Sequence, residues 1–228
     1  MKVLSLFDGI SCGKVALERS GFLNFRYYAS EIDKNAIKVS EDNHDGVVRL
    51  GDVTKLSYKE GFLITENEKR YIGKIDLLIG GSPCQSFSYA AAYQGNQNGL
   101  DGKSKLFYEY LRLLNEIREF NPDVKFLLEN VKMKKESRQQ LNEYLGVTGV
   151  DFNSNLVSFQ SRPRIYWANW DWELPDDRGV NFQDYIGVGV TKDCIPNATP
   201  SRQRMWNDGN GNNSRGSCAN ITHAKKVY

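Results

Sequence analysis

The stretch "KVLSLFDGISCGKVALERSGFLNFRYYASEI", residues 2–32, places a helical segment between two apolar runs. Residues 2–7 predict a buried strand, residues 12–21 a helix that Gly21 closes, and residues 25–32 a second strand. A strand, a helix and a second strand in this order are typical of a parallel βαβ unit, whose helices cover both faces of the sheet. The stretch therefore predicts an α/β fold.

The alternation of strands and helices continues along the chain. Asp33 is placed to cap a helix over residues 33–43. The clearest helix spans residues 104–120, where one face carries the apolar side chains Leu106, Tyr110, Leu113, Leu114 and Ile117. Further strands are expected over residues 47–53, 75–81 and 121–130, and the β-rich run 161–170 is consistent with another. Residues 59–74 read as a polar insertion.

Composition indicates the class of protein. With 228 residues, 40% of them hydrophobic, the chain can bury one good core. No apolar run approaches the roughly 20 residues that span a bilayer, and the N-terminus does not resemble a signal peptide, so we expect a protein inside a cell with no membrane partner. None of the four cysteines forms a C-x-x-C pair and the two histidines lie far apart, so no metal site is expected.

The C-terminal part of the chain differs from the rest. Residues 173–228 are rich in Gly, Asn, Ser and Pro without a sustained period, which predicts a loop-rich appendage to a domain over residues 1–172. The formal net charge is +2, but residues 201–228 hold five Lys or Arg against Asp208, a net +4. The basic run 132–138 is a second candidate phosphate-facing surface, with a solvated helix face as the alternative.

Chemistry-bearing residues follow each predicted strand. In an open parallel sheet, ligands bind outside the carboxyl ends of the strands, near the point where the strand order reverses. The segments at these positions are "FDGISCG" (7–13), "EID" (31–33), "GDV" (51–53), "GGSPCQS" (80–86) and "EN" (129–130). We therefore expect them to converge on one edge of the sheet.

The first two of these segments indicate a nucleotide-like ligand. Glycines at a strand-to-helix turn allow a ligand to approach the backbone, and an acidic residue about 20 positions later suits a ribose. Gly9 and Glu31 have this spacing. A dehydrogenase is the rival interpretation, but Gly9 and Gly13 form G-x-x-x-G instead of the dinucleotide pattern G-x-G-x-x-G, and that function leaves Pro83 and Cys84 unexplained.

The motifs together resemble those of the cytosine carbon-5 DNA methyltransferases. "PCQ" (83–85), "ENV" (129–131) and "QSRPR" (160–164) follow "FDGISCG", "SEID" (30–33) and "GDV" in the order of that family, across residues 1 to about 170. "FDGISCG" and "SRPRIYWAN" are most similar to the de novo branch and its phage and bacterial relatives. The resemblance implies a Rossmann-like, S-adenosylmethionine-dependent methyltransferase sheet, with a partial target-recognition region over residues 173–228.

The resemblance also implies catalytic roles. Cys84 would be the nucleophile that attacks carbon 6 of a cytosine, and Glu129 would contact the ring nitrogen and the exocyclic amine. Arg164 would approach the base carbonyl, with Arg162 and Gln160 orienting neighbouring groups. The alternatives are structural: an inert buried cysteine, and a carboxylate that caps a helix or pairs with a lysine such as Lys132.

The same resemblance implies a binding site for S-adenosylmethionine. The residues it assigns to that site are Phe7, Asp8, Gly9, Ile10, Gly13, Glu31, Ile32, Asp52, Val53, Pro83 and Leu106. Glu31 would bind the ribose, Asp52 would accept from the adenine amino group, and Ile32 and Val53 would pack on adenine. Each could instead be a turn or core residue.

The implied partner is double-stranded DNA, from which the target base must be extruded. Residues 86–103, with three glycines in a polar stretch, are then expected to form a mobile lid. The motif and the final helix that complete the cofactor pocket in the family are not found. The open interpretations are a truncated enzyme, a split enzyme that needs a complementing chain or a second copy, a non-catalytic relative that binds DNA, and an enzyme acting on RNA.

Overall fold

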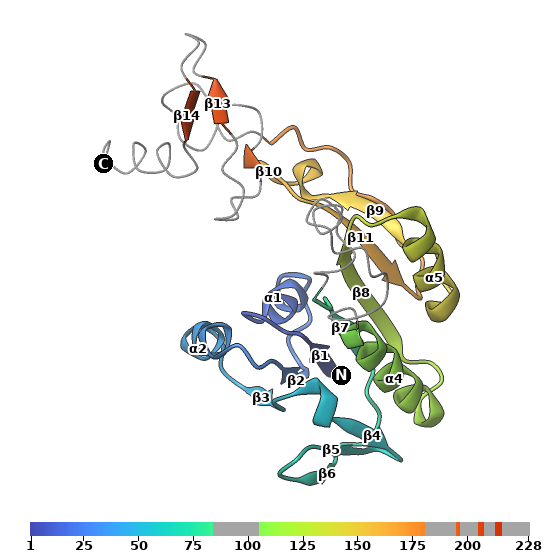
Figure 1. Cartoon of the computed structure of the whole chain (residues 1–228). Coiled ribbons are helices and arrows are strands. Elements are labelled where there is room, and N and C mark those ends of the chain that lie inside the picture. The colour runs from blue at the N-terminus through green and yellow to red at the C-terminus, as the bar shows by residue number, and fades with distance from the viewer. Residues whose placement is uncertain (84–104, 181–194, 197–204, 208–212, 216–228) are drawn as a thin grey trace. The chain divides into compact units, whose positions relative to one another are not determined.

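The computed structural model describes residues 1–83, 105–180, 195–196, 205–207 and 213–215 (Figure 1). These form two compact units. The first contains residues 1–151 and 164–172, and the second contains residues 152–163 and 173–228.

A seven-stranded sheet forms the centre of the first unit, in the order β3-β2-β1-β7-β8-β11-β9. Its strands are β1 (Lys2–Leu6), β2 (Arg26–Ser30), β3 (Val47–Arg49), β7 (Leu77–Gly80), β8 (Lys125–Val131), β9 (Val150–Asn153) and β11 (Pro163–Ala168). The five strands from β3 to β8 are parallel, whereas β11 runs antiparallel to β8. The predicted α/β class is confirmed, and all the strands expected from the sequence are present.

Helices pack on both faces of this sheet (Figure 1). They are α1 (Cys12–Arg19), α2 (Lys34–Asn43), α4 (Lys105–Phe120) and α5 (Lys135–Leu145), with a 3₁₀ turn η1 (Val53–Lys55). The predicted apolar face of α4 is confirmed, since Tyr110, Leu113 and Ile117 are fully buried. A helix face is the alternative interpretation of the basic run 132–138, and the structure has a helix there, α5. The basic run leads into it, and Leu141 and Leu145 are its buried residues.

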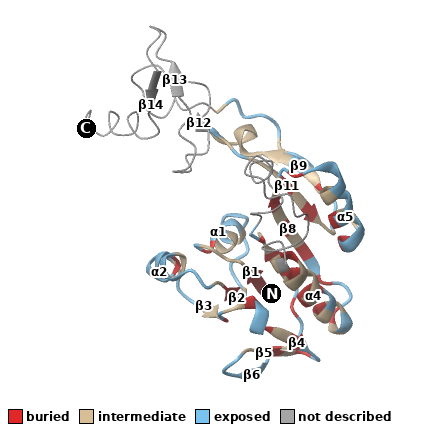
Figure 2. Cartoon of the chain, viewed as in Figure 1, coloured by how far each residue is buried: buried red, intermediate tan, exposed pale blue. Residues whose placement is uncertain are grey.

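The central strands are apolar because both of their faces are buried. Successive side chains of a strand point to opposite faces. Accordingly, Leu4 and Tyr28 belong to a large core under α4, whereas Val3, Tyr27 and Ile79 belong to a smaller core on the other face. Figure 2 shows this buried centre within an exposed outer surface. A continuous apolar run, instead of an alternating one, is the expected signature of such strands.

The insertion at residues 59–74 contains structure that the sequence interpretation missed. Strands β4 (Ser57–Lys59), β5 (Phe62–Ile64) and β6 (Lys69–Tyr71) form an antiparallel sheet. Gly61, with a φ of 83°, makes the first turn possible, since this left-handed conformation favours glycine. Three-residue strands are too short for a clear period, and charged residues surround them, which is why the segment reads as a polar loop.

The second unit has short elements. They are η3 (Ser154–Leu156), β10 (Gln160–Ser161) parallel to β12 (Ile195–Pro196), and β13 (Met205–Asn207) antiparallel to β14 (Asn213–Arg215). Most of the basic tail lies outside the described residues, and the boundary between residues 172 and 173 stays a prediction. Among the described helices, none has the length and apolar character needed to cross a bilayer.

Replacing Asp33 by alanine is expected to lower the free energy of unfolding by about 1 kcal/mol. The Asp33 carboxylate caps α2 by accepting from the amides of Asn35 and Ala36, at 2.8 and 3.3 Å. Asp42→Ala on the same helix is the control, because it removes an exposed pair with Lys38 that contributes about 0.5 kcal/mol or less. Urea unfolding measures both, and equal losses would contradict the capping role.

Candidate functional site

The carboxyl ends of the central strands are level with one another. Leu6 of β1 lies opposite both Ser30 of β2 and Gly80 of β7, and Gly80 lies opposite Leu128 of β8. The next residues along these strands are Phe7, Glu31, Gly81 and Glu129, four positions within the predicted site segments. The strand order reverses between β1 and β7, which is where open α/β sheets bind ligands (Figure 1). The structure therefore brings the described parts of four of the five predicted strand-end segments to one edge.

The turn after β1 has an unusual backbone. Phe7, Gly9 and Ser11 have φ values of 56°, 59° and 63°, although only one of them is glycine. Non-glycine residues in this region cost about 1–3 kcal/mol each and persist only where the surroundings hold them. Such strain is concentrated at ligand sites, which makes this turn a candidate for one.

Glu31 holds the turn from the side of β2. Its carboxylate accepts from the amides of Gly9, Ile32 and Asp33, at 2.7, 2.8 and 2.9 Å. An ionised carboxylate offers about four lone-pair positions, so it can still accept from a ligand hydroxyl. Glu31 thus links the ends of β1 and β2. It can also still accept a hydrogen bond from a ribose hydroxyl, as its predicted role requires.

Asp8 is the centre of a buried polar network that the sequence interpretation missed. Its side chain has 0% exposure. One carboxylate oxygen accepts from the hydroxyls of Ser5 and Tyr27, both at 2.6 Å, and the other accepts from Ser11 at 2.5 Å. Arg49 Nη1 lies 3.7 Å from the second oxygen. Any contact of Asp8 with a ligand would therefore be through its backbone, because its carboxylate is used within the protein.

The network extends to the neighbouring elements. Ser40 of α2 exchanges a hydrogen bond with Ser11 and accepts another from Arg49. Burial, together with the negative charge of Asp8, raises the pKa of Tyr27 well above its ordinary value, so Tyr27 remains a hydrogen-bond donor. Two features of the sequence could have indicated this network. Asp8 directly follows the predicted strand 2–7, and Arg49 lies within the mostly apolar predicted strand 47–53.

Gly13 has a packing role in this structure. A Cβ at Gly13 would lie 2.4 Å from Ile79 Cδ1 and 2.8 Å from the Tyr27 hydroxyl. Only glycine therefore lets the first turn of α1 approach β2 and β7 this closely. The glycine that the sequence places in a ligand-binding turn also sets the position of the helix that follows the turn.

Two large apolar side chains beside the strand ends are exposed. Ile10 is 46% exposed and Ile32 is 69% exposed. Val53 is buried, Leu106 packs against the core from a half-buried position, and Pro83 is exposed. Both isoleucines are therefore accessible to an apolar part of a ligand at this edge.

Asp52 follows β3 and faces a small cavity. Its carboxylate accepts from the amide and the hydroxyl of Thr54, both at 2.9 Å, and so caps η1. The cavity has a volume of about 290 Å³, and the residues lining it are Arg49, Leu50, Gly51, Asp52, Lys55 and residues 65–68. It is therefore a candidate extension of the site toward the β3 edge.

Glu129 and Arg164 form an ion pair at the other end of the site. Arg164 Nε lies 2.6 Å from Glu129 Oε1, and the two side chains are 14% and 31% exposed, with Arg164 the less exposed of the two. Arg164 pairs with Val131 across the antiparallel strands, so its side chain lies diagonally beside Glu129 on the same face. A Cβ at Gly81 would lie 3.0 Å from Glu129 Oε2. Glycine at this position therefore leaves room for the carboxylate.

A second contact holds the segment that leads to Cys84. Buried Asn130, the neighbour of Glu129 on β8, donates to the hydroxyl of Ser82 at 3.2 Å. Cys84 itself and the expected lid at residues 86–103 lie outside the described residues. The structure thus defines the chain up to Pro83, on the same edge as the ion pair.

The remaining predicted site residues belong to the second unit. Gln160 and Arg162 are exposed, and the amide of Arg162 donates to the side-chain oxygen of Asn153 at 2.8 Å. Within the described ranges, no group of three or more His, Cys, Asp or Glu side chains is arranged to hold a metal ion.

Comparison with known proteins gives one family. The model of the C-5 cytosine-specific DNA methylases matches residues 1–155. The chain is 37% identical over 134 residues to the orphan methyltransferase M.Rho11sI of Bacillus phage rho11s, covering 58% of this chain and 23% of that protein. It is 36% identical over 196 residues to the type II methyltransferase M.DsaV of Dactylococcopsis salina, covering 81% of this chain and 46% of the relative.

A third relative and a solved structure agree with these matches. The type II methyltransferase M.FnuDI of Fusobacterium nucleatum is 37% identical over 132 residues, covering 58% of this chain and 33% of that protein. The chain thus spans less than half the length of these relatives. The crystal structure of the S. pombe Dnmt2 methyltransferase has the same fold, with a TM-score of 0.52 at 18% identity, over 77% of this chain and 52% of that one.

The raised pKa of the buried Tyr27 predicts that the protein loses folding stability at alkaline pH. The pKa of Tyr27 is raised above its ordinary value of 10.0, so the folded chain holds the phenol proton more tightly than the unfolded chain does. This contribution is fully present below about pH 10 and is lost as the pH rises further. We expect Tyr27→Phe to reduce the fall in unfolding free energy between pH 8 and about pH 11.

In Tyr27→Phe, the fall in unfolding free energy at high pH should be reduced and not abolished. Burial also raises the pKa of Tyr58 to about 12, and this tyrosine stays in the variant. Urea unfolding at several pH values measures the effect. Tyr144→Phe, at a residue that is 45% exposed, is the control and should leave the fall unchanged. An identical pH dependence in the wild type and Tyr27→Phe would be evidence against the linkage.

Proposed function

The chain belongs to the C-5 cytosine-specific DNA methylase family, and on that premise we propose that it transfers a methyl group from S-adenosylmethionine to carbon 5 of cytosine in double-stranded DNA. The observation that carries the proposal is the Glu129–Arg164 ion pair, 2.6 Å long, at the strand edge that also bears Gly81 and the segment leading to Cys84. A cation and a carboxylate placed together suit the two sides of a cytosine, which has a carbonyl oxygen and an exocyclic amine.

The proposed reaction begins at Cys84. Its thiolate would attack carbon 6, forming a sulfur–carbon bond and moving electron density toward carbon 5. S-adenosylmethionine supplies an electrophilic methyl group at its sulfonium. Carbon 5 would form a bond to that methyl group while the bond from sulfur to methyl breaks and leaves a neutral thioether. Loss of the proton on carbon 5 would then restore the double bond and release the Cys84 thiolate.

Glu129 and Arg164 would stabilise the charge that the attack places on the ring. Glu129 would hold a proton at the ring nitrogen and accept from the exocyclic amine, while Arg164 would donate to the base carbonyl. Entry of the base between them replaces their ion pair with these contacts. Both side chains are partly exposed, which is consistent with an exchange of partners.

The residues around the turn after β1 fit the methyl donor. The exposed Ile10 and Ile32 offer apolar surface for the adenine and the methionine chain. The Glu31 carboxylate would accept from ribose hydroxyls, and Asp52 would accept from the adenine amino group. Phe7, Asp8 and Gly9 would contribute backbone groups, whereas Gly13 and Val53 would shape the pocket from positions packed against the core.

The remaining assignments concern the nucleic acid. The target base lies within a duplex and must be extruded to reach Cys84. Gln160 and Arg162 would orient groups next to Arg164, residues 86–103 would close over the site, and residues 173–228 would contact the DNA grooves. Pro83 and Leu106 would border the pocket. A DNA substrate, and the phage and bacterial sources of the relatives, favour this activity in a bacterial or phage-infected cell.

The central test is methyl transfer from labelled S-adenosylmethionine to DNA. We expect Cys84→Ala to abolish labelled 5-methylcytosine, and Glu129→Gln to lower the transfer rate by about 10²–10⁴-fold, the usual contribution of a general acid or base. Glu41→Gln, at an exposed position of α2, is the matched control and should keep the wild-type rate.

The covalent bond between Cys84 and the cytosine is tested by a separate measurement. DNA carrying 5-fluorocytosine cannot lose a proton from carbon 5, so the adduct should persist and appear as a mass shift that Cys84→Ala lacks. Undiminished transfer by Cys84→Ala would refute the nucleophile. DNA binding without transfer would indicate a binding protein, and labelled RNA without labelled DNA would indicate an RNA methyltransferase.

The donor site is tested separately by calorimetric titration with S-adenosylmethionine. Glu31→Ala removes the acceptor for three amides and for the ribose, so we expect binding weaker by about 10–100-fold. Glu41→Ala should bind as the wild type does. If Glu31→Ala binds S-adenosylmethionine with wild-type affinity, Glu31 is not part of the binding site.

A further inference from the structure

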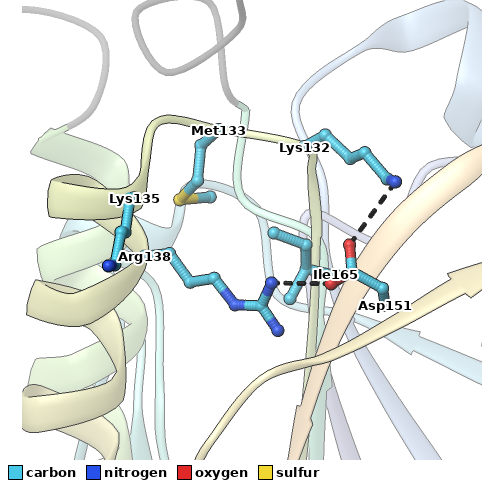
Figure 3. A pocket seen from close by; sticks show the side chains of 6 residues that line it. All are labelled: Lys132, Met133, Lys135, Arg138, Asp151 and Ile165. Carbon is cyan, nitrogen blue, oxygen red and sulfur yellow. Dashed lines mark hydrogen bonds and ion pairs between the residues drawn. The ribbon is translucent and has the colours of Figure 1, made fainter.

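A second concave site lies in the first unit, apart from the residues assigned above. It has a volume of about 270 Å³, and the residues lining it are Lys132, Met133, Lys135, Arg138, Asp151 and Ile165 (Figure 3). These six residues are called the basic pocket here. They come from the segment after β8, from α5, from β9 and from β11, so the pocket is built by several elements of the second half of the first unit.

The charges in the basic pocket are unbalanced. Arg138 Nη1 lies 2.6 Å from Asp151 Oδ2, and its Nη2 donates to the carbonyl of Gly149, so this guanidinium is anchored to the protein (Figure 3). Lys132 lies 3.7 Å from the other Asp151 oxygen, and its side chain is 53% exposed. Three cationic side chains and one carboxylate thus line the pocket, which leaves an excess positive charge of two.

Lys135 has no ion-pair partner within 4 Å among the residues that the structure describes. The apolar wall comes from Met133 and Ile165, both almost completely buried. Positive charge above an apolar wall in a concave site attracts anions more strongly than the same charge on a flat surface. The anchored Arg138 gives the pocket a fixed donor, and the two lysines can adjust to a ligand.

The basic pocket shares β11 with the Glu129–Arg164 pair and begins directly after β8, the strand of Glu129. Lys132 is three residues beyond Glu129 on the same chain, about 10 Å at the rise of a β-strand. Ile165 directly follows Arg164 on β11, so it lies on the opposite face of the sheet from the ion pair. A nucleic acid that crosses the end of β8 to reach the ion pair would pass Lys132.

We propose that the basic pocket binds a backbone phosphate of the DNA substrate, with Lys132 and Lys135 as the adjustable donors and Arg138 as the fixed one. The proposal rests on the function proposed above. Lysine and arginine are the side chains that hold phosphates, and such contacts position a protein on DNA independently of sequence. None of the six lining residues is aromatic, so the pocket suits a phosphate and not a stacked base.

The test uses a duplex that contains only dA and dT, which has no cytosine to methylate. Affinity measured by fluorescence anisotropy at several NaCl concentrations gives the slope of log K against log salt, whose magnitude decreases by about 0.9 for each phosphate that the protein ceases to neutralise. We expect the double variant Lys132→Ala/Lys135→Ala to bind several-fold more weakly and to show this smaller slope. The control Lys38→Ala/Lys69→Ala removes two exposed lysines elsewhere in the same unit and should keep the wild-type slope.

A local signal distinguishes the pocket from a general reduction of positive charge. The chain has three methionines, so methyl-¹³C-methionine labelling gives three signals, and Met133→Leu identifies the one from the pocket. The duplex should shift the Met133 signal in the wild type and in the control, but not in the Lys132→Ala/Lys135→Ala variant. Inorganic phosphate is the second probe.

Two results would overturn the proposal: equal salt slopes in the two double variants, or a Met133 signal that responds to inorganic phosphate and not to the duplex. The second result would identify a free-anion site. Methyl transfer to cytosine DNA is measured in parallel. Its absence in the wild type, with the slope change still present, would count against the proposed function and leave the phosphate site standing.

Discussion

The buried carboxylate of Asp8 is the constraint on which the site depends. A charge with no exposed surface is very costly unless it is paired and hydrogen-bonded. Here β1 supplies Ser5, the turn after β1 supplies Ser11, β2 supplies Tyr27 and β3 supplies Arg49. Satisfying this one carboxylate therefore fixes β1, β2, β3 and the start of α1 relative to one another.

The level strand ends follow from that arrangement. Because β1 aligns in register with both β2 and β7, the segments after these strands reach the same edge, and Glu31 can accept from the amide of Gly9. Glycine is needed where this packing is tightest, at Gly13 against Ile79 and at Gly81 against Glu129. A rigid sheet with strained turns is the usual construction for a site that must be formed before its ligand arrives.

Two kinds of electrostatic group meet at β8 and β11. The Glu129–Arg164 pair is partly shielded from water and balanced in charge, which suits the recognition of a neutral base with donors and acceptors. The basic pocket is open and carries excess positive charge, which suits a phosphate. Strands β8 and β11 with the segment and helix that follow β8 would thus serve both the chemistry of the base and the position of the backbone that carries it.

The sequence alone determined the α/β class, the order of the parallel strands along the chain, the apolar face of α4 and the cap at Asp33, because these depend on periodicity and on contacts a few residues apart. It also placed Glu129 at the end of a strand and, through the family resemblance, assigned Arg164 to the same site. Only the tertiary structure decided that Glu129 pairs with Arg164 and not with Lys132, that Asp8 is buried, and that the basic run begins a helix beside Asp151. These outcomes depend on register and burial between segments distant in sequence, which local patterns do not encode.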